Sequence, residues 1–393
     1  GLKLDGQYSP LTRVGLLGMK GDLFTGTNGQ KTIVSLDCHE ISGWFNPLGI
    51  AFHRWQMDDL HVKWGTVVLQ KTEAVPGEKP KGMPWWEIFW PYRVHLEDVK
   101  VDDACALWKL KDQDSGIYHA FLEITPNGHD FEYDARGGDF KTPLTPPLKL
   151  SHLHMLIRKP RLYCDELLLG EDATQSGGQV RISGDAGLQE DRSIKLAVDL
   201  TSLKIAPWLP ENLRGHVLGH FSGHLDYAST GSSLDTASGD GHFDVADAVL
   251  HQLPPLQHYI TLTGSPDPGD LPLKVCQTDV TLKEGAITAE NLQIESPGVF
   301  RVRGTIEVAK DKTLSGSLTL GLTDPYLKWL PNARQTIFTQ DDGDYRVTTI
   351  ELSGTLEHPK EDLSPRVMAQ IQKSPGTELK LFFNQAGEWF GIH

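Results

Sequence analysis

The sequence lacks most of the features that identify large protein classes. It contains only four cysteines, Cys38, Cys105, Cys164 and Cys276, and their wide spacing excludes a CxxC metal or redox motif. In an oxidising compartment they allow two disulfides with three connectivities, and in a reducing one they are small apolar side chains. A helix needs about 20 apolar residues to span a bilayer, and no apolar run in the sequence approaches this length. No signal peptide is recognisable, but the chain begins at Gly1 rather than Met, which leaves open an export signal or anchor upstream.

Positive charge is also scarce. Lysine and arginine number 37 against 52 aspartates and glutamates, so the formal net charge is -15. A chain of this charge has no overall field that attracts phosphate backbones, which excludes nucleic acid as an expected partner. Hydrophobic residues make up only 39% of the 393 residues, which is little for a chain of this length folded as one ball. The composition therefore favours an extended or thin-layered body.

Catalytic signatures are missing as well. The sequence has no GxSxG elbow, Walker loop, GxGxxG turn or HExxH pair. Its many carboxylates single out no pair with the separation that a glycosidase needs. We therefore expect a protein that is not an enzyme and that carries no cofactor.

The sequence does contain regular alternation of apolar and polar residues. This alternation covers residues 32–38, 61–69, 92–99, 193–200, 299–308 and 314–320. A period of two indicates strands with one face buried. Turn-rich connectors such as residues 230–233 and 266–270 separate them, and the acidic segment 341–344, DDGD, predicts a tight hairpin turn rather than a calcium loop. The chain is thus predicted to be mainly β, with an antiparallel sheet and a few short helices.

Helix signals are few. Ser364 followed by Pro365 predicts a helix over 366–373, with the serine as N-cap and the proline at the first helical position. A shorter helix is expected over 246–251. From Thr377 onward, apolar residues at helical spacing predict an amphipathic helix that docks on the sheet or lies on a membrane surface. Its stripe consists of Leu379, Phe382, Phe383, Trp389 and Phe390.

A proline-rich segment suggests a division of the chain. Three prolines between residues 141 and 147 cannot sit in a central strand, so this segment is a linker candidate. We place a boundary near residue 148. The expected parts are an N-terminal β region with the aromatic segment described below (1–148), a second β region (149–362) and a C-terminal helical segment (363–393).

The second β region carries a loose internal repeat. LAVDLTSLKIAPWLP at 196–210 and LTLGLTDPYLKWLP at 318–331 each consist of an alternating strand followed by Trp-Leu-Pro. The two copies are followed, at different spacings, by a strand that contains Ser-Gly. Such duplication favours stacked β units over a closed enzyme fold.

Clusters of potential metal ligands are explained better without a metal. His216, His220 and His224 would share one face of a helix, but the intervening glycines favour a strand, in which neighbouring histidines of this set lie ~13 Å apart. His152 and His154 share a strand face, but no third ligand is near them in the sequence. We therefore expect no metal site.

One aromatic segment stands apart from the strands. Trp85, Trp86, Phe89 and Trp90 follow a loop rich in proline and lysine. Such a cluster is typical of a membrane interface or of contact with a partner's pocket. The alternative is a short helix whose aromatic side chains seal the end of the sheet. We take these four residues as candidate partner or membrane contacts, and the C-terminal stripe as a second candidate.

The C-terminal half shows a recurring order of strands and turns. It contains LKEGAITAENLQIE at 282–295, SPGVFRVRGTI at 296–306 and LSGSL at 314–318, and closes with IELSGTLEHPKEDL at 350–363. This pattern resembles the AsmA-like family of bacterial envelope proteins, most clearly over about residues 180–365. Motifs of this kind specify a fold better than an activity.

The resemblance implies an elongated, strongly twisted antiparallel sheet that is curled into a groove with an apolar inside. It also implies a periplasmic protein, tethered to the inner membrane by an N-terminal helix absent from this sequence, that acts in phospholipid transfer or outer-membrane biogenesis. It supplies no catalytic residues. We therefore expect a phospholipid or another amphiphile as ligand, and a membrane surface or an envelope protein as further partner. The alternatives are a scaffold or adhesion module that docks a protein partner and a polysaccharide-acting enzyme.

Overall fold

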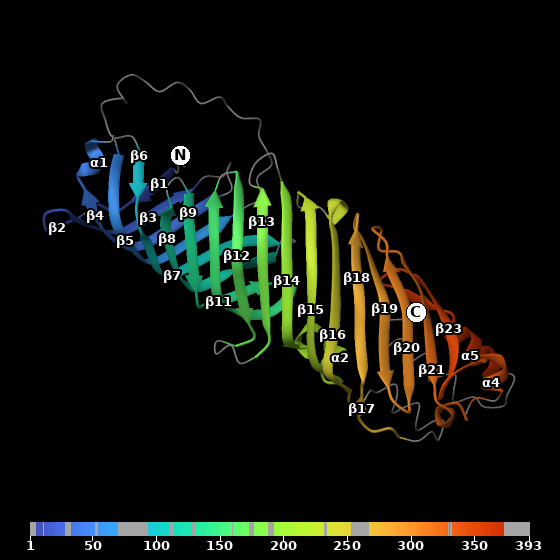
Figure 1. Cartoon of the computed structure of the whole chain (residues 1–393). Coiled ribbons are helices and arrows are strands. Elements are labelled where there is room, and N and C mark those ends of the chain that lie inside the picture. Colours follow the sequence, from blue (N-terminus) through green and yellow to red (C-terminus); the bar gives the residue numbers. More distant parts are fainter. Residues whose placement is uncertain are drawn as a thin grey trace. The chain divides into compact units, whose positions relative to one another are not determined.

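The chain is mainly β and mostly antiparallel, as predicted, with only short helices between the strands (Figure 1). The structure is a computed structural model. It describes residues 5–10, 12–27, 33–51, 54–69, 93–110, 113–127, 130–158, 160–172, 177–187, 192–231, 234–252, 267–328, 330 and 332–372. The chain divides into two compact units, Gly1–Glu190 and Asp191–His393.

Unit 1 consists of strands and one short helix in its described residues. Its elements are β1 (Asp5–Tyr8), β2 (Thr12–Val14), β3 (Gly18–Thr27), β4 (Ile33–Asn46), α1 (Leu48–Ala51), β5 (Arg54–Leu69), β6 (Arg93–Leu96), β7 (Val99–Leu110), β8 (Gln113–Asn127), β9 (Asp130–Arg136), β10 (Asp139–Thr142), β11 (Thr145–Arg158), β12 (Arg161–Gly170) and β13 (Gln179–Gly187).

The strands of unit 1 pair antiparallel with one exception. Strand β5 runs parallel to β6 and to β7, which the expectation of an antiparallel sheet did not include. Parallel neighbours need a crossover of about a dozen residues or more. The sequence between Leu69 and Arg93 is long enough for this, whereas only two residues separate β7 from β8 and β8 from β9.

A small core lies on one face of unit 1. Val62 of β5 and Val99 and Val101 of β7 are buried and pack together. Half-buried apolar side chains from the neighbouring strands surround them, including Leu122 of β8 and Ala104 of β7. The register shift between Val101 and Ala104 changes the alternation of β7, so Ala104 also lies on the core face and its two neighbours lie on the opposite face.

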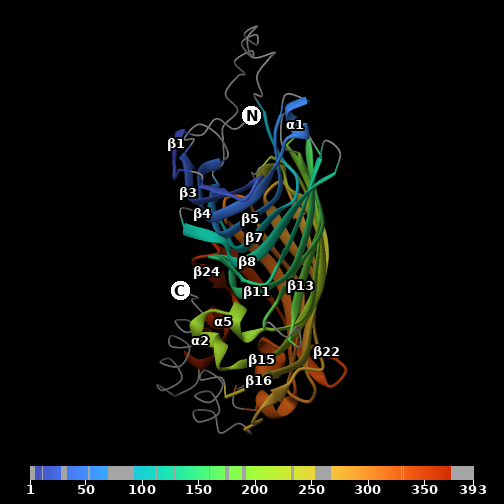
Figure 2. The same ribbon diagram turned by 90° about the vertical axis from the view of Figure 1, so that its left-hand side faces the viewer.

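Unit 2 is an antiparallel meander in which short helical segments connect some strands (Figures 1 and 2). Its elements are β14 (Ser193–Lys204), η2 (Ala206–Trp208), α2 (Glu211–Arg214), β15 (Val217–Thr230), η3 (Leu234–Thr236), β16 (Ser238–Leu250), β17 (Leu271–Pro272), β18 (Val275–Lys283), β19 (Ala286–Ser296), β20 (Phe300–Val308), β21 (Leu314–Leu322), η4 (Asp324–Tyr326), α4 (Ala333–Thr336), β22 (Gln340–Asp342), β23 (Tyr345–Gly354), β24 (Pro359–Glu361) and α5 (Leu363–Gln372).

A cluster of fully buried side chains in unit 2 lies near the C-terminal end of the described chain. Leu327, Leu330, Ile337 and Phe338 come from the connection between β21 and β22, and Val367 comes from α5. Leu320 and Leu322 of β21 pack against this cluster. The helical segments therefore close one end of the meander, while the strands before β21 contribute few fully buried residues.

Two local predictions are confirmed, one of them in part. A helix occupies Leu363–Gln372, where 366–373 was predicted. Ser364 and Pro365 lie within its first turn, so Ser364 is not the N-cap, and the Glu361 carboxylate accepts a hydrogen bond from the Ser364 backbone N–H (2.8 Å). The segment 341–344 forms the end of β22 and the tight turn to β23, with Gly343 at φ 65°.

The two copies of the repeat also share structure that was not predicted from the sequence. In both, the strand is followed by a 3-10 helix with proline in its first turn, and a one-turn α-helix comes just after the copy.

Two other local predictions are wrong. Residues 246–250 continue strand β16 and pair with β15, so they form no helix. A bulge at Asp247 and Ala248, opposite Gly219, shifts the register of this pairing, and long-range pairing overrides the local helix preference. The segment 141–147 is the hairpin between β10 and β11 and not a linker, because its prolines lie at the turn and at the first positions of β11. Strand β11 runs through residue 148 without a break.

Candidate functional site

One face of unit 2 carries apolar side chains that are only half-buried. Directly paired residues of neighbouring antiparallel strands point to the same side of a sheet. Val198, Leu225, Gly241, Val280 and Ala289 form one such row across β14, β15, β16, β18 and β19. Further rows run parallel to it, and together they define the apolar face of unit 2. Twelve large side chains near its middle are Leu196, Val198, Phe221, Leu225, Phe243, Val280, Leu282, Ile294, Val302, Ile306, Leu318 and Leu320.

The exposure of this face is unusual for so many apolar residues. These twelve side chains are all of intermediate exposure, whereas Leu203 and Leu314, which lie at the margins of the same face, are buried. An antiparallel sheet normally packs one face on a core and leaves the other in water. Here the face with the composition of a core remains partly open to solvent in the described residues. A contiguous apolar surface of this kind marks a binding site.

The opposite face of the same strands is polar. The row Asp199, His224, His242, Asp279 and Glu290 lies one residue out of phase with the apolar row. The Nδ1 atom of His224 lies 2.7 Å from Asp199, and that of His242 lies 2.6 Å from Asp279. The hydrogen bond to Asp199, followed by one to Asp226, raises the pKa of His224. These pairs keep the polar face hydrated and charged, so the two faces of the sheet differ sharply in polarity.

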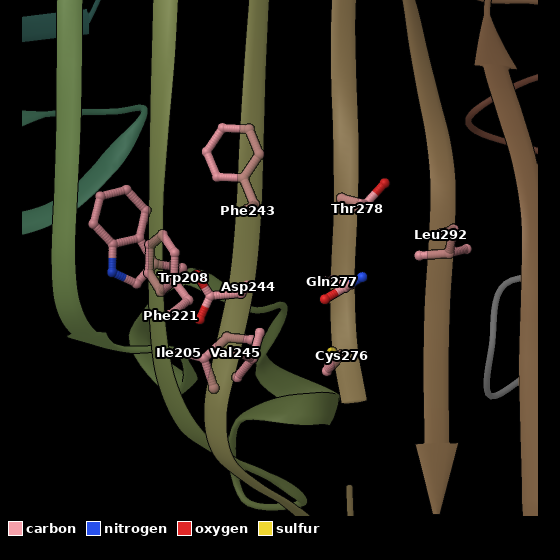
Figure 3. Close-up of a pocket in the computed structure, with 10 residues that line it drawn as sticks. All are labelled: Ile205, Trp208, Phe221, Phe243, Asp244, Val245, Cys276, Gln277, Thr278 and Leu292. Atoms are coloured by element: carbon pink, nitrogen blue, oxygen red, sulfur yellow. The ribbon is translucent and has the colours of Figure 1, made fainter. Parts of the chain in front are cut away.

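A pocket of about 340 Å³ opens on the apolar face, next to the end of the first copy of the repeat. Its lining consists of Ile205, Trp208, Phe221, Phe243, Asp244, Val245, Cys276, Gln277, Thr278 and Leu292, which come from η2 and four strands (Figure 3). The Trp208 ring packs edge-on against Phe221, with 5.4 Å between the ring centroids. The lining side chains are mainly apolar, and the volume lies within the range of small-molecule sites.

Cys276 is the one thiol in this pocket. Burial, and secondarily the Asp244 carboxylate, raise its pKa above the ordinary value. A raised pKa keeps the sulfur in its neutral form at physiological pH, where it is a poor nucleophile. The pocket can therefore hold an apolar group but presents no activated nucleophile. All four cysteines of the chain are free thiols.

The predicted contact residues are not placed by the structure. Trp85, Trp86, Phe89 and Trp90 lie outside the described residues. The same applies to the C-terminal stripe, Leu379, Phe382, Phe383, Trp389 and Phe390.

Two of the three histidines predicted to lie along one strand do so. His220 and His224 belong to β15, and His216 precedes it, with Nδ1 3.0 Å from the carbonyl oxygen of His251. In unit 1, His152 lies 3.0 Å from both Glu166 and Asp134, and these two hydrogen bonds raise its pKa. These histidines thus serve as partners of carboxylates or of the backbone.

Sequence reasoning missed two features of unit 1. The first is a set of exposed apolar side chains at one end of β2–β4 and on α1, here called the apolar tip: Val14, Leu16, Leu17, Trp44, Leu48 and Ile50. Leu16 is 79% and Trp44 is 56% exposed. The second is a group of three metal-ligating side chains, Asp103, Cys105 and His119. Neither has a sequence signature, because hairpin contacts and bulges bring these residues together.

Comparisons of the chain with family models, curated proteins and solved structures found no match. Every helix within the described ranges is too short or too polar to span a bilayer. The chemical character of the apolar face and its pocket is therefore the main evidence on function.

Proposed function

We propose that the protein binds the hydrocarbon chains of a phospholipid or similar amphiphile on the apolar face of unit 2 and transfers them without catalysing a reaction. The observation that supports this proposal most directly is the row of large apolar side chains that remain half-exposed across successive strands. Each methylene group removed from water contributes about 0.8 kcal/mol. The burial of a long acyl chain across several strands would therefore offset the conformational entropy that the chain loses on binding.

The chemistry of the two faces supports this class of ligand. An acyl chain offers no hydrogen bonds, and the apolar face supplies none from charged side chains. The row that begins at Asp199 gives the opposite face a hydrated surface. The pocket next to Trp208 can hold the terminal part of one acyl chain. These features fit a carrier of apolar molecules better than an enzyme for polysaccharides, which needs two carboxylates in one cleft.

The cellular setting is part of the same proposal. The resemblance of segments 282–318 and 350–363 to the AsmA-like family supports a periplasmic protein that is tethered to the inner membrane. It also supports a role in lipid transport for outer-membrane biogenesis. A carrier in this compartment has to shield acyl chains from water between two membranes, and an apolar sheet face meets that need.

A second candidate function is docking of a protein partner or a membrane surface. It is favoured by the apolar tip of unit 1, where Leu16, Trp44 and Leu48 expose more than half of their surface. Large exposed apolar side chains on neighbouring segments mark interaction sites. Replacing Trp44 and Leu48 by serine should then abolish partner capture or vesicle binding and leave lipid uptake by unit 2 intact.

The test of the main proposal uses two neighbouring residues of β18. Val280 belongs to the apolar face, and Thr281 points to the polar face. In Val280→Arg, a charge on the apolar face should lower the uptake of a fluorescent phospholipid by about tenfold or more, because burying the arginine guanidinium under an acyl chain is unfavourable. Thr281→Arg adds the same side chain to the polar face and should leave uptake unchanged.

Three results would contradict the proposal. The first is that the wild-type protein takes up no fluorescent phospholipid. The second is that gently purified protein contains no lipid by native mass spectrometry. The third is that Val280→Arg and Thr281→Arg reduce uptake equally although circular dichroism shows both to be folded.

A further inference from the structure

Three side chains with different ligand atoms converge in unit 1, on the face of the sheet opposite to the core formed by Val62, Val99 and Val101. Asp103 and Cys105 lie on β7, and His119 lies on β8. One carboxylate oxygen, the thiol sulfur and one ring nitrogen all lie within 4.8 Å of one another. The His119 Nδ1 atom is 3.1 Å from Oδ1 of Asp103. No other group of three such side chains is this close together within the described residues.

The backbone is irregular at this place on both strands. The pairing of β7 with β8 shifts register between Val101 and Ala104 and again between Ala104 and Ala106. His119 has a φ of 60°, in the left-handed region that side-chain-bearing residues rarely adopt. Bulges re-aim side chains, and they are common next to functional sites. Here the two shifts direct Asp103 and Cys105 toward the same histidine.

We propose that Asp103, Cys105 and His119 form a binding site for a divalent transition-metal ion, with Zn²⁺ as the ion that best matches the donors. One thiolate, one imidazole and one carboxylate form a borderline-soft ligand set, which disfavours Ca²⁺ and Mg²⁺ because these ions prefer oxygen ligands. Ligand atoms around a tetrahedral zinc ion lie about 3.3 to 3.8 Å apart. Small rotations of the three side chains bring their ligand atoms, which lie within 4.8 Å of one another, to these separations.

The position of the site determines its use. Ala104 packs on the core of unit 1, so its neighbours Asp103 and Cys105 face the solvent side of the sheet. The His119 side chain is 68% exposed. Three protein ligands on an accessible face leave the fourth coordination position to water. The bound ion would hold the double bulge between β7 and β8 in one arrangement and so stabilise unit 1.

A simpler explanation has to be separated from this one. Histidine–aspartate pairs occur in both units, for example His152 with Asp134 in unit 1 and His224 with Asp199 in unit 2. His119 and Asp103 alone form a pair of the same kind. What distinguishes the site is the thiol of Cys105, so the experiment has to detect a sulfur–metal bond.

The experiment is a Co²⁺ titration of the metal-free, reduced full chain, followed by absorption spectroscopy. We expect one equivalent of Co²⁺ to produce a thiolate-to-cobalt charge-transfer band that Zn²⁺ abolishes by displacement. Cys105→Ser should remove the band. Replacing a residue that only supports a metal ligand typically lowers metal affinity by about 10- to 100-fold. His119→Asn replaces a ligand itself, so it should weaken metal binding by about tenfold or more. Asparagine tolerates the left-handed backbone conformation, so this variant keeps the fold.

Cys164→Ser is the matched control, because it removes another half-buried thiol of unit 1 and should leave the band unchanged. The proposal is overturned if wild-type protein shows no charge-transfer band at millimolar Co²⁺, or if the band persists in Cys105→Ser. A Zn²⁺-dependent rise in the unfolding temperature of wild-type protein, absent in His119→Asn, would support it.

Discussion

His224 and His242 are paired directly across strands β15 and β16, and each forms an ion pair with a carboxylate on the strand beyond. Asp199 of β14 contacts His224, and Asp279 of β18 contacts His242. Four side chains therefore form one continuous row across the polar face of unit 2. Each histidine thus has a carboxylate partner at its own end of the row, and these contacts hold the two rings in place.

The first prediction concerns the pH dependence of stability. The pKa of His224 is raised from its ordinary value of 6.5, chiefly by the hydrogen bond to Asp199. Its contribution to stability is therefore fully present below pH 6.5 and is lost as the pH rises through the raised folded pKa. Urea unfolding across this range should show that the free-energy difference between wild type and His224→Gln is largest at the acidic end.

An independent measurement checks the cause. Asp199→Asn removes the main partner, so NMR titration should show the pKa of His224 falling toward 6.5 in this variant. Asp226→Asn should have a smaller effect because Asp226 is the weaker contributor. If the pKa of His224 is the same in all three proteins, this explanation is wrong.

The second prediction compares two phenylalanines in unit 2. Phe338 is only 3% exposed in the C-terminal cluster, whereas Phe243 is half-buried on the apolar face. Phe338→Ala should lower the free energy of unfolding by about 3–5 kcal/mol, as core truncations do. Phe243→Ala should cost only about 1–2 kcal/mol, because less apolar surface leaves the interior. Chemical denaturation of both variants measures the difference.

This comparison also tests whether the apolar face is open in solution. If Phe243→Ala costs as much as Phe338→Ala, another segment covers the face in the free protein. That result would count against a surface available to lipid.

The third prediction concerns close approach between strands. A Cβ atom built on Gly241 would lie 2.6 Å from the backbone oxygen of His224, closer than side chains tolerate. Gly241→Ala should therefore force the strands apart and destabilise the protein by about 1–3 kcal/mol. Gly215, at the end of α2, has helical φ and no atom within 4 Å of such a Cβ. Gly215→Ala should change stability by less than about 0.5 kcal/mol.

Thermal or chemical unfolding of both glycine variants provides the measurement. Equal stabilities of Gly241→Ala and Gly215→Ala would show that β15 and β16 lie farther apart than described.

The fourth prediction concerns thiol reactivity. Burial, with a smaller contribution from Asp37, raises the pKa of Cys38 to about 11. At pH 8, only roughly one molecule in a thousand then carries the reactive thiolate at this position. Iodoacetamide labelling followed by peptide mass spectrometry should show that Cys38 reacts at least about a hundredfold more slowly in native than in denatured protein. Equal rates in the two states would contradict this environment for Cys38.

The sequence predicted those parts of the fold that depend on neighbouring residues. The alternation of residues such as Val198 and Asp199 identified strands and their two faces, because period two is a local property of the chain. The turn at Gly343 and a helix over 366–373, observed at Leu363–Gln372, were predicted for the same reason. The 3-10 and one-turn helices that follow the strands of the repeat were not predicted, although Pro207 and Pro325 lie in the first turns of the 3-10 helices.

Features that depend on distant residues were not predictable in this way. Residues 246–250 carry a weak helical pattern but form a strand, because pairing with β15 stabilises the extended conformation. The parallel pairing of β5 with β7 leaves no trace in either strand's own sequence. The pocket beside Trp208 likewise requires residues from η2 and four strands.

The sequence by itself determined that this protein is built from strands with one apolar and one polar face, since the pattern is written in consecutive residues. Only the tertiary structure decided that the apolar face of unit 2 stays half-exposed, while burial is concentrated around Phe338. It alone also brought Asp103, Cys105 and His119 together. The physical reason is that exposure and convergence depend on register, bulges and the packing of distant segments, and these are properties of paired strands rather than of any one strand.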